Sequence, residues 1–515
     1  MIIRGIVHQL FILKFFYFIR YYYADLLLGR KDMENAISNI VLMIVLKIID
    51  VLYTPWIVPL LLLAGGLYFT IRTRFMQVSM FKDSIKVVSE KPKSENGISS
   101  FGALMVSTAS RVGTGNIIGV ATAIILGGAG SIFWMWITAI FGGASAFVES
   151  TLAQIYKKKN SDGSSYGGPA YYMRDAIRFK GLGKALGVFF SIIIIFTYAV
   201  GYNMLAAYNL QSTFSTFSFY NQNSPKVIGV ILALAFGAIV IGGAKRLSDV
   251  TKILVPVMGV IYVGVALVVI LMNIKNVPHM FQLIFANAFD FKAIFGGFTG
   301  SCIMFGVKRG LYSNEAGMGS APNAAATADV SHPVKQGLVQ MLSVFIDTLL
   351  ICSTTAFLCL ITDVDPQKYI AGDAANAAGY VQAAIHSTLG NFGPIFIAIS
   401  MFFFAFTTLI GNYSYCEGCL AFVLKRNLKR QEALVFRCIA IVLIYVGAVS
   451  QADLVWNMAD MAQGFMVITN MPVILFLGGT AVRCLNDYRK QKHAGLDPHF
   501  IASDIGIHDE TDFWK

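Results

Sequence analysis

The chain has 515 residues, of which 56% are hydrophobic and 13% charged, and its mean hydropathy is +0.65. This composition excludes a water-soluble globular protein. It predicts an all-α polytopic membrane protein in the lipid bilayer, because the apolar runs reach the roughly 20 residues that a spanning helix needs. The net charge of +12 comes from short basic blocks between apolar runs. Such blocks indicate membrane topology and argue against a nucleic-acid partner.

Residues 1–42 form an extension ahead of the first clear span. Charged residues interrupt its apolar and aromatic sequence, and it shows no small-residue cleavage site. Met33 opens a more ordinary start. The extension is therefore read either as a wrongly assigned start or as an interfacial helix.

Eleven spans are predicted after this extension, in the order 43–71, 98–126, 131–156, 185–213, 227–243, 250–273, 293–320, 337–361, 391–424, 433–450 and 453–481. The basic blocks fall on alternate connections, as positive-inside orientation requires. This pattern places the amino end near residue 40 outside the plasma (inner) membrane and the tail, 482–515, in the cytoplasm. The tail is short and polar and suggests no role of its own.

The second predicted span contains an interruption, "SRVGTGNIIGVATA" at 110–123. Gly113 and Gly115 flank Thr114, and an unwound turn at 112–115 would free backbone groups that lipid cannot satisfy. The amino end of the following half-helix suits a carboxylate, and the freed carbonyls suit Na⁺ or an ammonium group. The alternative is that these glycines only allow close helix packing.

A second segment, "KRGLYSNEAGMGSA" at 308–321, interrupts another span in the same way. When it is shifted by 198 residues, identical residues coincide: Arg111 with Arg309, Asn116 with Asn314, Gly119 with Gly317 and Ala123 with Ala321. The same shift places Phe345 on Phe147 and Asp347 on Glu149. Five spans separate the two copies, and an odd number inverts the second one. The predicted fold is a five-plus-five inverted-repeat transporter, with repeats at 98–273 and 293–481 and one extra helix at 43–71.

Five longer motifs carry a resemblance to a known family: "RVGTGNIIGVATA", "FGGASAFVESTLAQIYK", "YGGPAYYM", "GVKRGLYSNEAGMGSAPNAAATADV" and "FAFTTLIGNYSYCEG". With these motifs the chain resembles the alanine or glycine:cation symporter family, within the amino acid, polyamine and organocation superfamily. The likeness runs from about residue 50 to 483. It implies a transporter and not an enzyme: sodium-coupled uptake of small neutral amino acids, with Na⁺ as coupling ion and no organic cofactor.

The resemblance also implies a substrate site at the two interruptions. The amides of Thr114 and Gly115 would hold the substrate carboxylate, and the second broken helix would close the other side with Tyr312, Ser313 and Asn314. Asn116 would orient the first break, ligate a cation through its amide oxygen, or only hydrogen-bond between helices.

A sodium site is implied next to the first break. The hydroxyls of Thr407 and Thr408 would join the carbonyls of Ala109 and Val112, because Na⁺ takes hard oxygen ligands. The alternative for both threonines is a hydrogen bond back to their own helix.

Asn412 departs from the family pattern, in which many members have a tryptophan. It lies one helical turn after Thr408, where it would face the substrate side chain. Asparagine leaves room and offers a donor and an acceptor, so we expect glutamine to be accepted as well as alanine and glycine. The alternative is that Asn412 packs against its neighbours.

Several ionisable residues lie inside spans and are functional candidates by default, as gating ion pairs or as structural pairs. They are Arg111, Glu149, Lys308, Arg309, Glu315, Asp347 and Glu417. Glu149 and Asp347 could instead carry protons, which leaves H⁺ coupling open. A non-transporting amino-acid sensor is the other alternative. A channel, an intramembrane hydrolase and an ATP-driven pump are disfavoured, since the sequence lacks their motifs.

Overall fold

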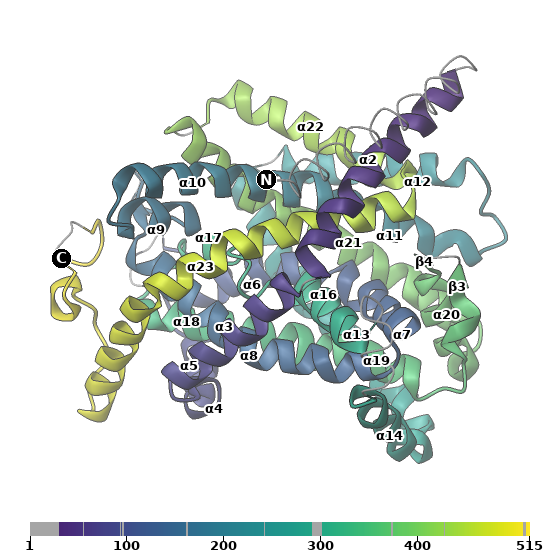
Figure 1. The fold of residues 1–515 in the computed structure, drawn as a ribbon, viewed down its shortest axis with the longest axis horizontal. Coiled ribbons are helices and arrows are strands. Elements are labelled where there is room, and N and C mark those ends of the chain that lie inside the picture. The colour runs from purple at the N-terminus through teal and green to yellow at the C-terminus, as the bar shows by residue number, and fades with distance from the viewer. Residues whose placement is uncertain are drawn as a thin grey trace, which may run out of the picture.

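Helices make up most of the described chain (Figure 1). The computed structural model describes residues 30–515 except 55, 93, 95–96, 161–162, 242, 291–300, 372–373, 427 and 508–510. Most of the predicted extension, residues 1–29, and the start of the predicted span 293–320 lie outside the described residues.

The predicted first span consists of two helices, α2 (Arg30–Tyr53) and α3 (Ile57–Arg72). Trp56, between them, adopts a left-handed conformation with φ 60°. Two short helices follow, α4 (Met76–Ser79) and α5 (Phe81–Val88). The extra amino-terminal span is therefore jointed, where the hydropathy pattern predicts one continuous helix.

The first predicted repeat begins with a bent pair, α6 (Ser100–Arg111) and the π-helix η1 (Gly115–Gly119) continued by α7 (Val120–Gly127), and the two arms differ in direction by 53°. The other helices of this half are α8 (Gly130–Ile155), α9 (Pro169–Ala176), α10 (Lys180–Ile195), the π-helix η2 (Phe196–Tyr202), α11 (Asn203–Thr213), the 3₁₀ turn η3 (Phe214–Thr216), α12 (Ser224–Val240) and α13 (Gly243–Met272). The strands β1 (Lys158–Lys159) and β2 (Ser165–Tyr166) form a short antiparallel hairpin between α8 and α9.

The second predicted repeat begins with α16 (Cys302–Asn314), which stops at an irregular stretch before α17 (Pro322–Ala325). The other helices after α13 are η4 (Ile274–Asn276), α14 (Val277–Ala288), α18 (Pro333–Val344), the π-helix η5 (Phe345–Cys352), α19 (Ser353–Leu360), η6 (Pro366–Tyr369), α20 (Ala377–Leu389), α21 (Phe392–Leu424), α22 (Arg430–Val449), α23 (Ala452–His493) and η7 (Ala502–Ile505). The strands β3 (Ile370–Ala371) and β4 (Ala374–Ala375) pair in a second short hairpin.

By length and composition, eight helices of the described chain can cross a membrane, or nine when the bent pair is one span. This is fewer than the eleven predicted. The predicted span 227–243 is α12, a 17-residue apolar helix, and the described part of 293–320 contains only the 13-residue α16. Both predicted positions are helical, but these helices are shorter than a full span.

The central layer is built around α8, which is packed by α16, α18 and α3. Small residues bring these helices close together. A Cβ atom on Gly306 of α16 would lie 2.7 Å from the carbonyl oxygen of Ser131 on α8, and one on Gly66 of α3 would lie 2.8 Å from the backbone of Phe141 on α8. Such close backbone approach is how helices pack in lipid, where apolar side chains gain little from leaving their solvent.

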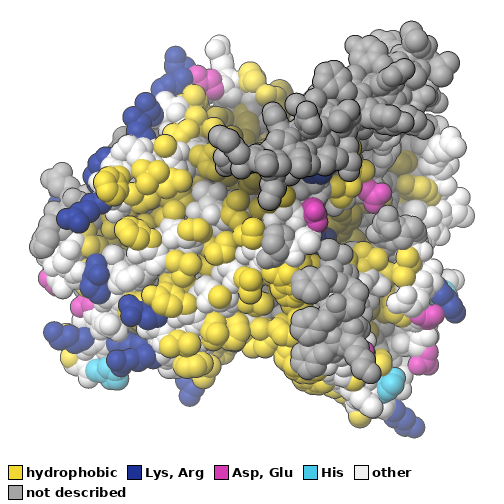
Figure 2. Space-filling view, in the orientation of Figure 1, with side chains coloured by type: hydrophobic (Ala, Val, Ile, Leu, Met, Phe, Trp, Pro, Cys, Tyr) yellow, Lys and Arg dark blue, Asp and Glu magenta, His cyan; other side chains and the backbone are white. Residues whose placement is uncertain are grey.

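The two ends of the spans carry different side chains. Hydrophobic side chains cover the middle of the molecule, and Lys and Arg gather along the left of the view (Figure 2). We call this end the basic face; it comprises α5, α9, the start of α10 and the ends of α8 and α23. The opposite end, near α20 and the β3–β4 hairpin, is called the far face (Figure 1).

The carboxy-terminal tail folds back onto the basic face. Trp514 is only 5% exposed, and its indole N–H donates to the carbonyl of Gln154 at 2.7 Å. The backbone of Phe500 donates to Ser331, and the Lys157 ammonium lies 4.9 Å from the centre of the Trp514 ring. The tail is therefore a packed element, although its polar sequence suggests no structural role.

Candidate functional site

The first break interrupts the helix at two residues, Val112 and Gly113, a shorter stretch than the predicted turn at 112–115. The Gly113 N–H donates to Asn116 Oδ1 at 2.7 Å, and not to the carbonyl of Ala109 four residues earlier. Asn116, inside η1, thus reaches back to satisfy the N–H three residues before it, as the third helical residue of a capping box does. The carbonyl of Ala109 thereby loses its regular helical donor.

Two close contacts explain the glycines of this break. A Cβ atom on Gly115 would lie 2.8 Å from the ring of Tyr312, and one on Gly113 would overlap the Thr408 hydroxyl. Both glycines therefore bring the broken arm against side chains of α16 and α21. Thr114 lies beside them, with its hydroxyl 3.3 Å from Tyr312 Oη and 3.2 Å from Asn209 Nδ2.

The second break follows α16, where Glu315 has φ 55°. Gly317 and Gly319 both have φ 82°, a conformation that glycine adopts without steric cost. Asn314 Oδ1 accepts from the backbone of Ala316, whereas its Nδ2 is buried without a hydrogen-bond partner among the described residues. Asn314 thus turns the chain inside its own break.

The two breaks meet at the buried carboxylate of Asp347, on η5. Asn116 Nδ2 donates to Asp347 Oδ1 at 2.7 Å, and the Ser313 hydroxyl donates to Oδ2 at 2.7 Å. The Thr348 hydroxyl lies 2.8 Å from the same Oδ2, and Asp347 is 0% exposed. Within the described part of the chain, no Lys, Arg or His forms an ion pair with it. Asn116 Nδ2 also lies 3.0 Å from Ser313 Oγ, so these two predicted residues are in direct contact and both bind the carboxylate of a third helix.

The two predicted threonines of α21 have different partners. The Thr407 hydroxyl donates to the carbonyls of Phe403 and Phe404, at 3.0 and 3.1 Å, in the back-bonded arrangement. The Thr408 hydroxyl points at Gly113, is buried, and has no hydrogen-bond partner among the described residues. Of these two threonines, therefore, Thr408 alone has a hydroxyl without a hydrogen-bond partner among the described residues.

Asn412 lies in a polar chain that links three helices to the second break. Its Nδ2 donates to Asn203 Oδ1 at 2.9 Å, and its Oδ1 lies 2.7 Å from Ser110 Oγ. Ser110 Oγ is also 2.7 Å from Glu315 Oε1, and Ser320 donates to Glu315 Oε2 at 2.8 Å. Asn412 itself is 0% exposed. These hydrogen bonds involve both polar atoms of the Asn412 amide and leave one of its N–H groups unused.

Other predicted ionisable residues are buried nearby. Arg111 donates only to Gln340, with Nε and Nη2 unpartnered among the described residues. Glu149 accepts from Asn470 Nδ2 at 2.9 Å and from the Gly317 N–H at 3.4 Å. Glu417 pairs with Arg437, at 3.5 Å. Within the part of the chain that the structure describes, Glu417 is the one of these three residues that belongs to an ion pair.

A cavity of about 530 Å³ opens on the far side of the breaks, and ion pairs form part of its wall. Arg309 Nη2 lies 2.8 Å from Asp460 Oδ2, and Lys308 Nζ lies 3.7 Å from the same oxygen. The Arg309 guanidinium also stacks over Trp456, at 4.4 Å from the ring centre. None of the predicted substrate-binding residues lines this cavity. Its wall contains the Arg309–Asp460 layer and Asn209, whose Nδ2 donates to the Thr114 hydroxyl at the first break.

A second set of contacts, which we call the Ser94–Asp329 layer, lies on the basic-face side of α6. Asp329 accepts from the backbone and hydroxyl of Ser94, at 2.7 and 2.8 Å, and Ile98 pairs with Ala328 in a parallel bridge. Gln336 donates to the Ser100 hydroxyl at 3.0 Å. The start of α6 is therefore fastened to the loop between α17 and α18.

Sequence reasoning missed several residues of this centre, namely Ser110, Asn203, Trp456 and Asp460. Asp460 carried a usable signal, since it is an acid inside a predicted span, "WNMADMAQ". Ser110 and Asn203 carried none, because a single small polar residue is common in membrane helices.

Two broken helices in inverted register meet at a buried polar centre, with a closed layer toward each face. This arrangement defines the chain as an inverted-repeat secondary transporter of the membrane.

Comparison with known proteins gives the family. The model of the sodium:alanine symporter family matches residues 38–502, and the chain belongs to that family. It is 43% identical over 470 residues to the probable sodium/glutamine symporter GlnT of Bacillus subtilis (strain 168), covering 90% of this chain and 94% of that protein. It is 38% identical to the sodium/alanine symporter AgcS of Methanococcus maripaludis, covering 84% of this chain and 94% of that protein. The predicted family and the transporter function are thereby confirmed, and the chain is a sodium-coupled amino-acid symporter.

Among solved structures, the crystal structure of MhsT in complex with L-phenylalanine matches with a TM-score of 0.50 at 16% sequence identity. The match covers 78% of this chain and 93% of that one. It supports the predicted inverted-repeat fold.

Proposed function

We propose that the chain imports small neutral amino acids, including glutamine as well as alanine and glycine, together with Na⁺ and by alternating access across the plasma membrane. The observation that carries the proposal is the meeting of the two breaks: their polar groups are buried and aimed at one another, and one hydroxyl oxygen and one carbonyl oxygen at the first break lack regular partners.

Those two oxygens support a Na⁺ site at the first break. The Thr408 hydroxyl points at Gly113, and the Ala109 carbonyl has lost the Gly113 N–H to Asn116. Together with the carbonyl of Val112 they offer hard oxygen ligands without a required charge, which suits Na⁺. Thr407 fits this site less well, since its hydroxyl is already bonded to its own helix.

The Asp347 carboxylate supports a second cation-binding position. A buried carboxylate without a cationic partner is costly, and its cost falls when a cation approaches. The Asp347 oxygens lie at the junction of Asn116 and Ser313, one from each broken helix. A second Na⁺, the substrate ammonium or a proton would each neutralise it, and this keeps proton coupling as the alternative mechanism.

The Asn412 amide supports acceptance of a polar substrate side chain. It joins Asn203, Ser110 and Glu315 in one chain, so donors and acceptors are already present where a larger aromatic residue would present only carbon and one N–H. The name of GlnT, a relative at 43% identity, agrees with glutamine as a substrate.

The two closed layers support alternating access. Opening the Arg309–Asp460 layer would join the far-face cavity to the breaks, and opening the Ser94–Asp329 layer would join them to the basic face. The basic face would be cytoplasmic by the positive-inside rule, with the far face and the start of α2 outside.

The test is radiolabelled uptake of alanine, glycine and glutamine into proteoliposomes under an inward Na⁺ gradient or an inward H⁺ gradient. We expect Na⁺-driven accumulation of all three, and Asn412→Trp should shift preference from glutamine toward alanine. Uptake of alanine alone by the wild type would contradict the proposed role of Asn412. Uptake driven only by H⁺ would replace the Na⁺ site with a proton-carrying Asp347. Binding without accumulation under either gradient would identify a sensor.

A further inference from the structure

A second cavity, unconnected with the transport pathway, lies on the basic face where α9, α10 and α21 meet. It has a volume of about 290 Å³ and lies between Tyr166, Tyr171, Val188 and Phe422 on its apolar side and four cations on its rim, Arg174, Lys184, Lys425 and Arg426. We call it the Lys184–Lys425 pocket. Figure 2 shows basic side chains gathered along this edge of the molecule.

The apolar side of the pocket is built by packed rings. Tyr171 meets Phe422 edge-on with ring centres 4.9 Å apart, and Tyr166 meets Tyr171 at 5.4 Å. The Arg174 guanidinium lies over both Tyr171 and Phe422, at 5.1 and 5.5 Å from the ring centres. These ring contacts and a bidentate bond to the Asp175 carboxylate hold Arg174 in a fixed position at the rim of the pocket.

The four rim cations are not equally compensated. Arg174 pairs with Asp175 at 2.6 Å, and Arg426 pairs with Glu432 at 2.6 Å. Lys184 and Lys425 have no acidic partner among the described residues, and both are exposed. The pocket therefore has two uncompensated positive charges, contributed by helices that are far apart in the sequence.

The depth of the pocket matches the level of lipid phosphates. Lys184 lies in the first turns of α10, where the apolar segment Lys180–Thr216 begins, and Lys425 directly follows α21, where Phe392–Leu424 ends. The ends of spanning helices lie at the boundary between hydrocarbon and head groups.

An apolar stripe continues from the pocket toward the middle of the bilayer. Lys184, Val188 and Ile192 are spaced four residues apart and share one face of α10. Ile192 is 54% exposed on the outside of the helix bundle. A ligand with a phosphate at Lys184 could thus extend acyl chains along Val188 and Ile192, which a free phosphate ion cannot do.

We propose that the Lys184–Lys425 pocket binds the phosphate of an anionic phospholipid from the leaflet at the basic face, with its acyl chains along α10. Basic pockets between spanning helices bind anionic lipid head groups in this way. A bound lipid would connect α10 to the end of α21 and so stabilise this side of the bundle.

The test is the thermal unfolding of the purified full-length protein in neutral detergent, with added phosphatidylglycerol, phosphatidylcholine or inorganic phosphate. We expect phosphatidylglycerol to raise the Tm saturably and the other two additions to leave it unchanged. In Lys184→Ala/Lys425→Ala, the phosphatidylglycerol concentration at half-effect should rise about 30-fold. This readout requires no transport, so it stands apart from the proposed function.

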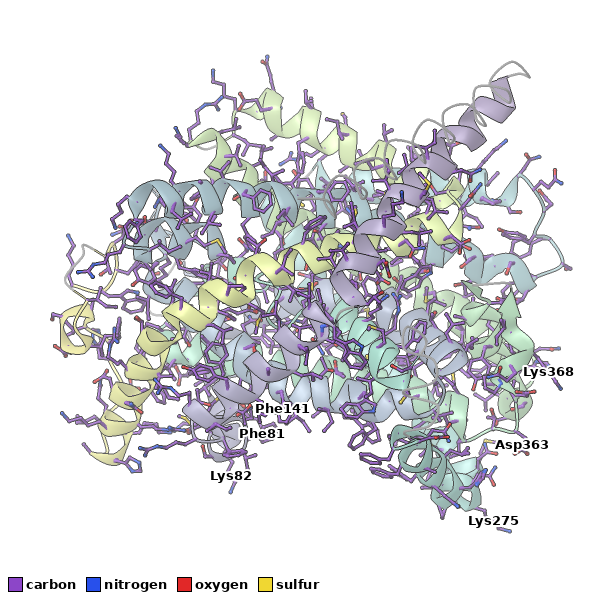
Figure 3. The ribbon with its side chains drawn as sticks, viewed as in Figure 1. Phe81, Lys82, Phe141, Lys275, Asp363 and Lys368 are labelled. Atoms are coloured by element: carbon purple, nitrogen blue, oxygen red, sulfur yellow. The ribbon has the colours of Figure 1, made fainter. Side chains whose placement is uncertain are left out.

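Lys82→Ala/Lys86→Ala is the matched control, because both lysines are exposed on α5 and line no part of this pocket. Figure 3 shows Lys82 at the lower edge of the view, away from α10. The control should respond to phosphatidylglycerol like the wild type. Lys184→Arg/Lys425→Arg keeps both charges and should also respond like the wild type, so it tests the proposal even if the alanine variant fails to fold. An unchanged response of the alanine variant would overturn the proposal, and an equal Tm rise with inorganic phosphate would overturn the assignment to a lipid.

Discussion

At the scale of single residues, side chains that look alike in the sequence have different hydrogen-bond partners in the buried polar centre. Thr407 and Thr408 are adjacent and equally buried, yet one hydroxyl is bonded to its own helix and the other points at the first break. Asn116 and Asn314 occupy matching places in the two repeats, but one caps a helix and the other turns the chain. Equivalent positions in an inverted repeat therefore need not have equivalent roles.

Thr408→Val tests this difference directly. Valine has the same shape and lacks the hydroxyl, so we expect the Na⁺ concentration for half-maximal uptake to rise about tenfold, the cost of one oxygen contact. Thr407→Val is the control and should change this value less than threefold. The measurement is the Na⁺ dependence of alanine uptake in proteoliposomes. A larger effect at Thr407 would place the cation on the other side of α21.

Asp347→Asn tests the acidic junction. Asparagine keeps the size of the side chain and removes its negative charge, so we expect Na⁺-driven uptake to fall at least tenfold while the protein still folds. The readouts are the uptake rate and the Tm in detergent. Unchanged uptake with unchanged Na⁺ dependence would exclude a charge-neutralising role for Asp347.

At the scale of elements, some glycines are required because a neighbouring helix leaves no room for a side chain. Gly411 of α21 lies against the backbone of α6, where an added Cβ atom would come 2.5 Å from Ser110 N. Gly418, on the same helix, has nothing within 4 Å of such an atom. The helix thus has one glycine required by packing and one that is not.

Gly411→Ala should therefore destabilise the protein by about 1–3 kcal/mol, as overpacking of a tight contact does. Gly418→Ala should be neutral or slightly stabilising, because alanine favours helix over glycine. Thermal unfolding in detergent compares the two variants. Equal Tm values would show that α21 can move away from α6 at no cost.

The positions of the broken helices could be predicted from the sequence, because glycines and charged residues inside apolar runs are unfavourable unless they line a site. The joint at Trp56 was missed because hydropathy averages over it, although Pro55, a helix-breaking residue, directly precedes it in the sequence. The partner of Arg309 was also missed, because Asp460 lies about 150 residues away and only the packed fold brings them together. The uncommitted state of the Thr408 hydroxyl depends on the rotation of α21, which hydropathy does not specify.

At the scale of the whole molecule, the two closed layers lie at opposite ends of the broken helices. The far-face layer depends on Asp460, shared by Arg309 and Lys308, and the basic-face layer depends on Asp329. Transport requires each layer to open in turn.

Asp460→Asn should impair the far-face layer, because it leaves the buried Arg309 without its carboxylate. We expect uptake to fall at least tenfold. Asp453→Asn, at the exposed rim of the same cavity, is the control and should retain most of the activity. Wild-type uptake by Asp460→Asn would show that this ion pair is not part of the gate.

The basic face should respond to acid through His332, which lies at the start of α18 against Phe500 of the tail and Tyr488 of α23. Its Nδ1 accepts from the Val334 N–H, and its Nε2 lies 3.2 Å from Asp487. Burial lowers the pKa of His332 from its ordinary value of 6.5, although Asp487 opposes this shift. The unfolded chain therefore binds a proton at higher pH than the folded one, and stability is lost as the pH falls below about 6.5.

His332→Asn removes the titrating group and keeps an acceptor for the Val334 N–H, since asparagine is a good N-cap. We expect the Tm of this variant to fall less than that of the wild type between neutral pH and the acid side of this window. Parallel Tm curves for the two proteins would assign the acid sensitivity to other groups.

The packed tail has a practical consequence for handling the protein. Trp514 is buried, and its indole is bound to α8 through the Gln154 carbonyl. An affinity or fluorescent tag attached directly at Lys515, the residue after Trp514, would crowd this indole and displace the tail. A tag at this end therefore needs a flexible spacer, and a fusion that lowers the Tm would itself report that the tail has been displaced.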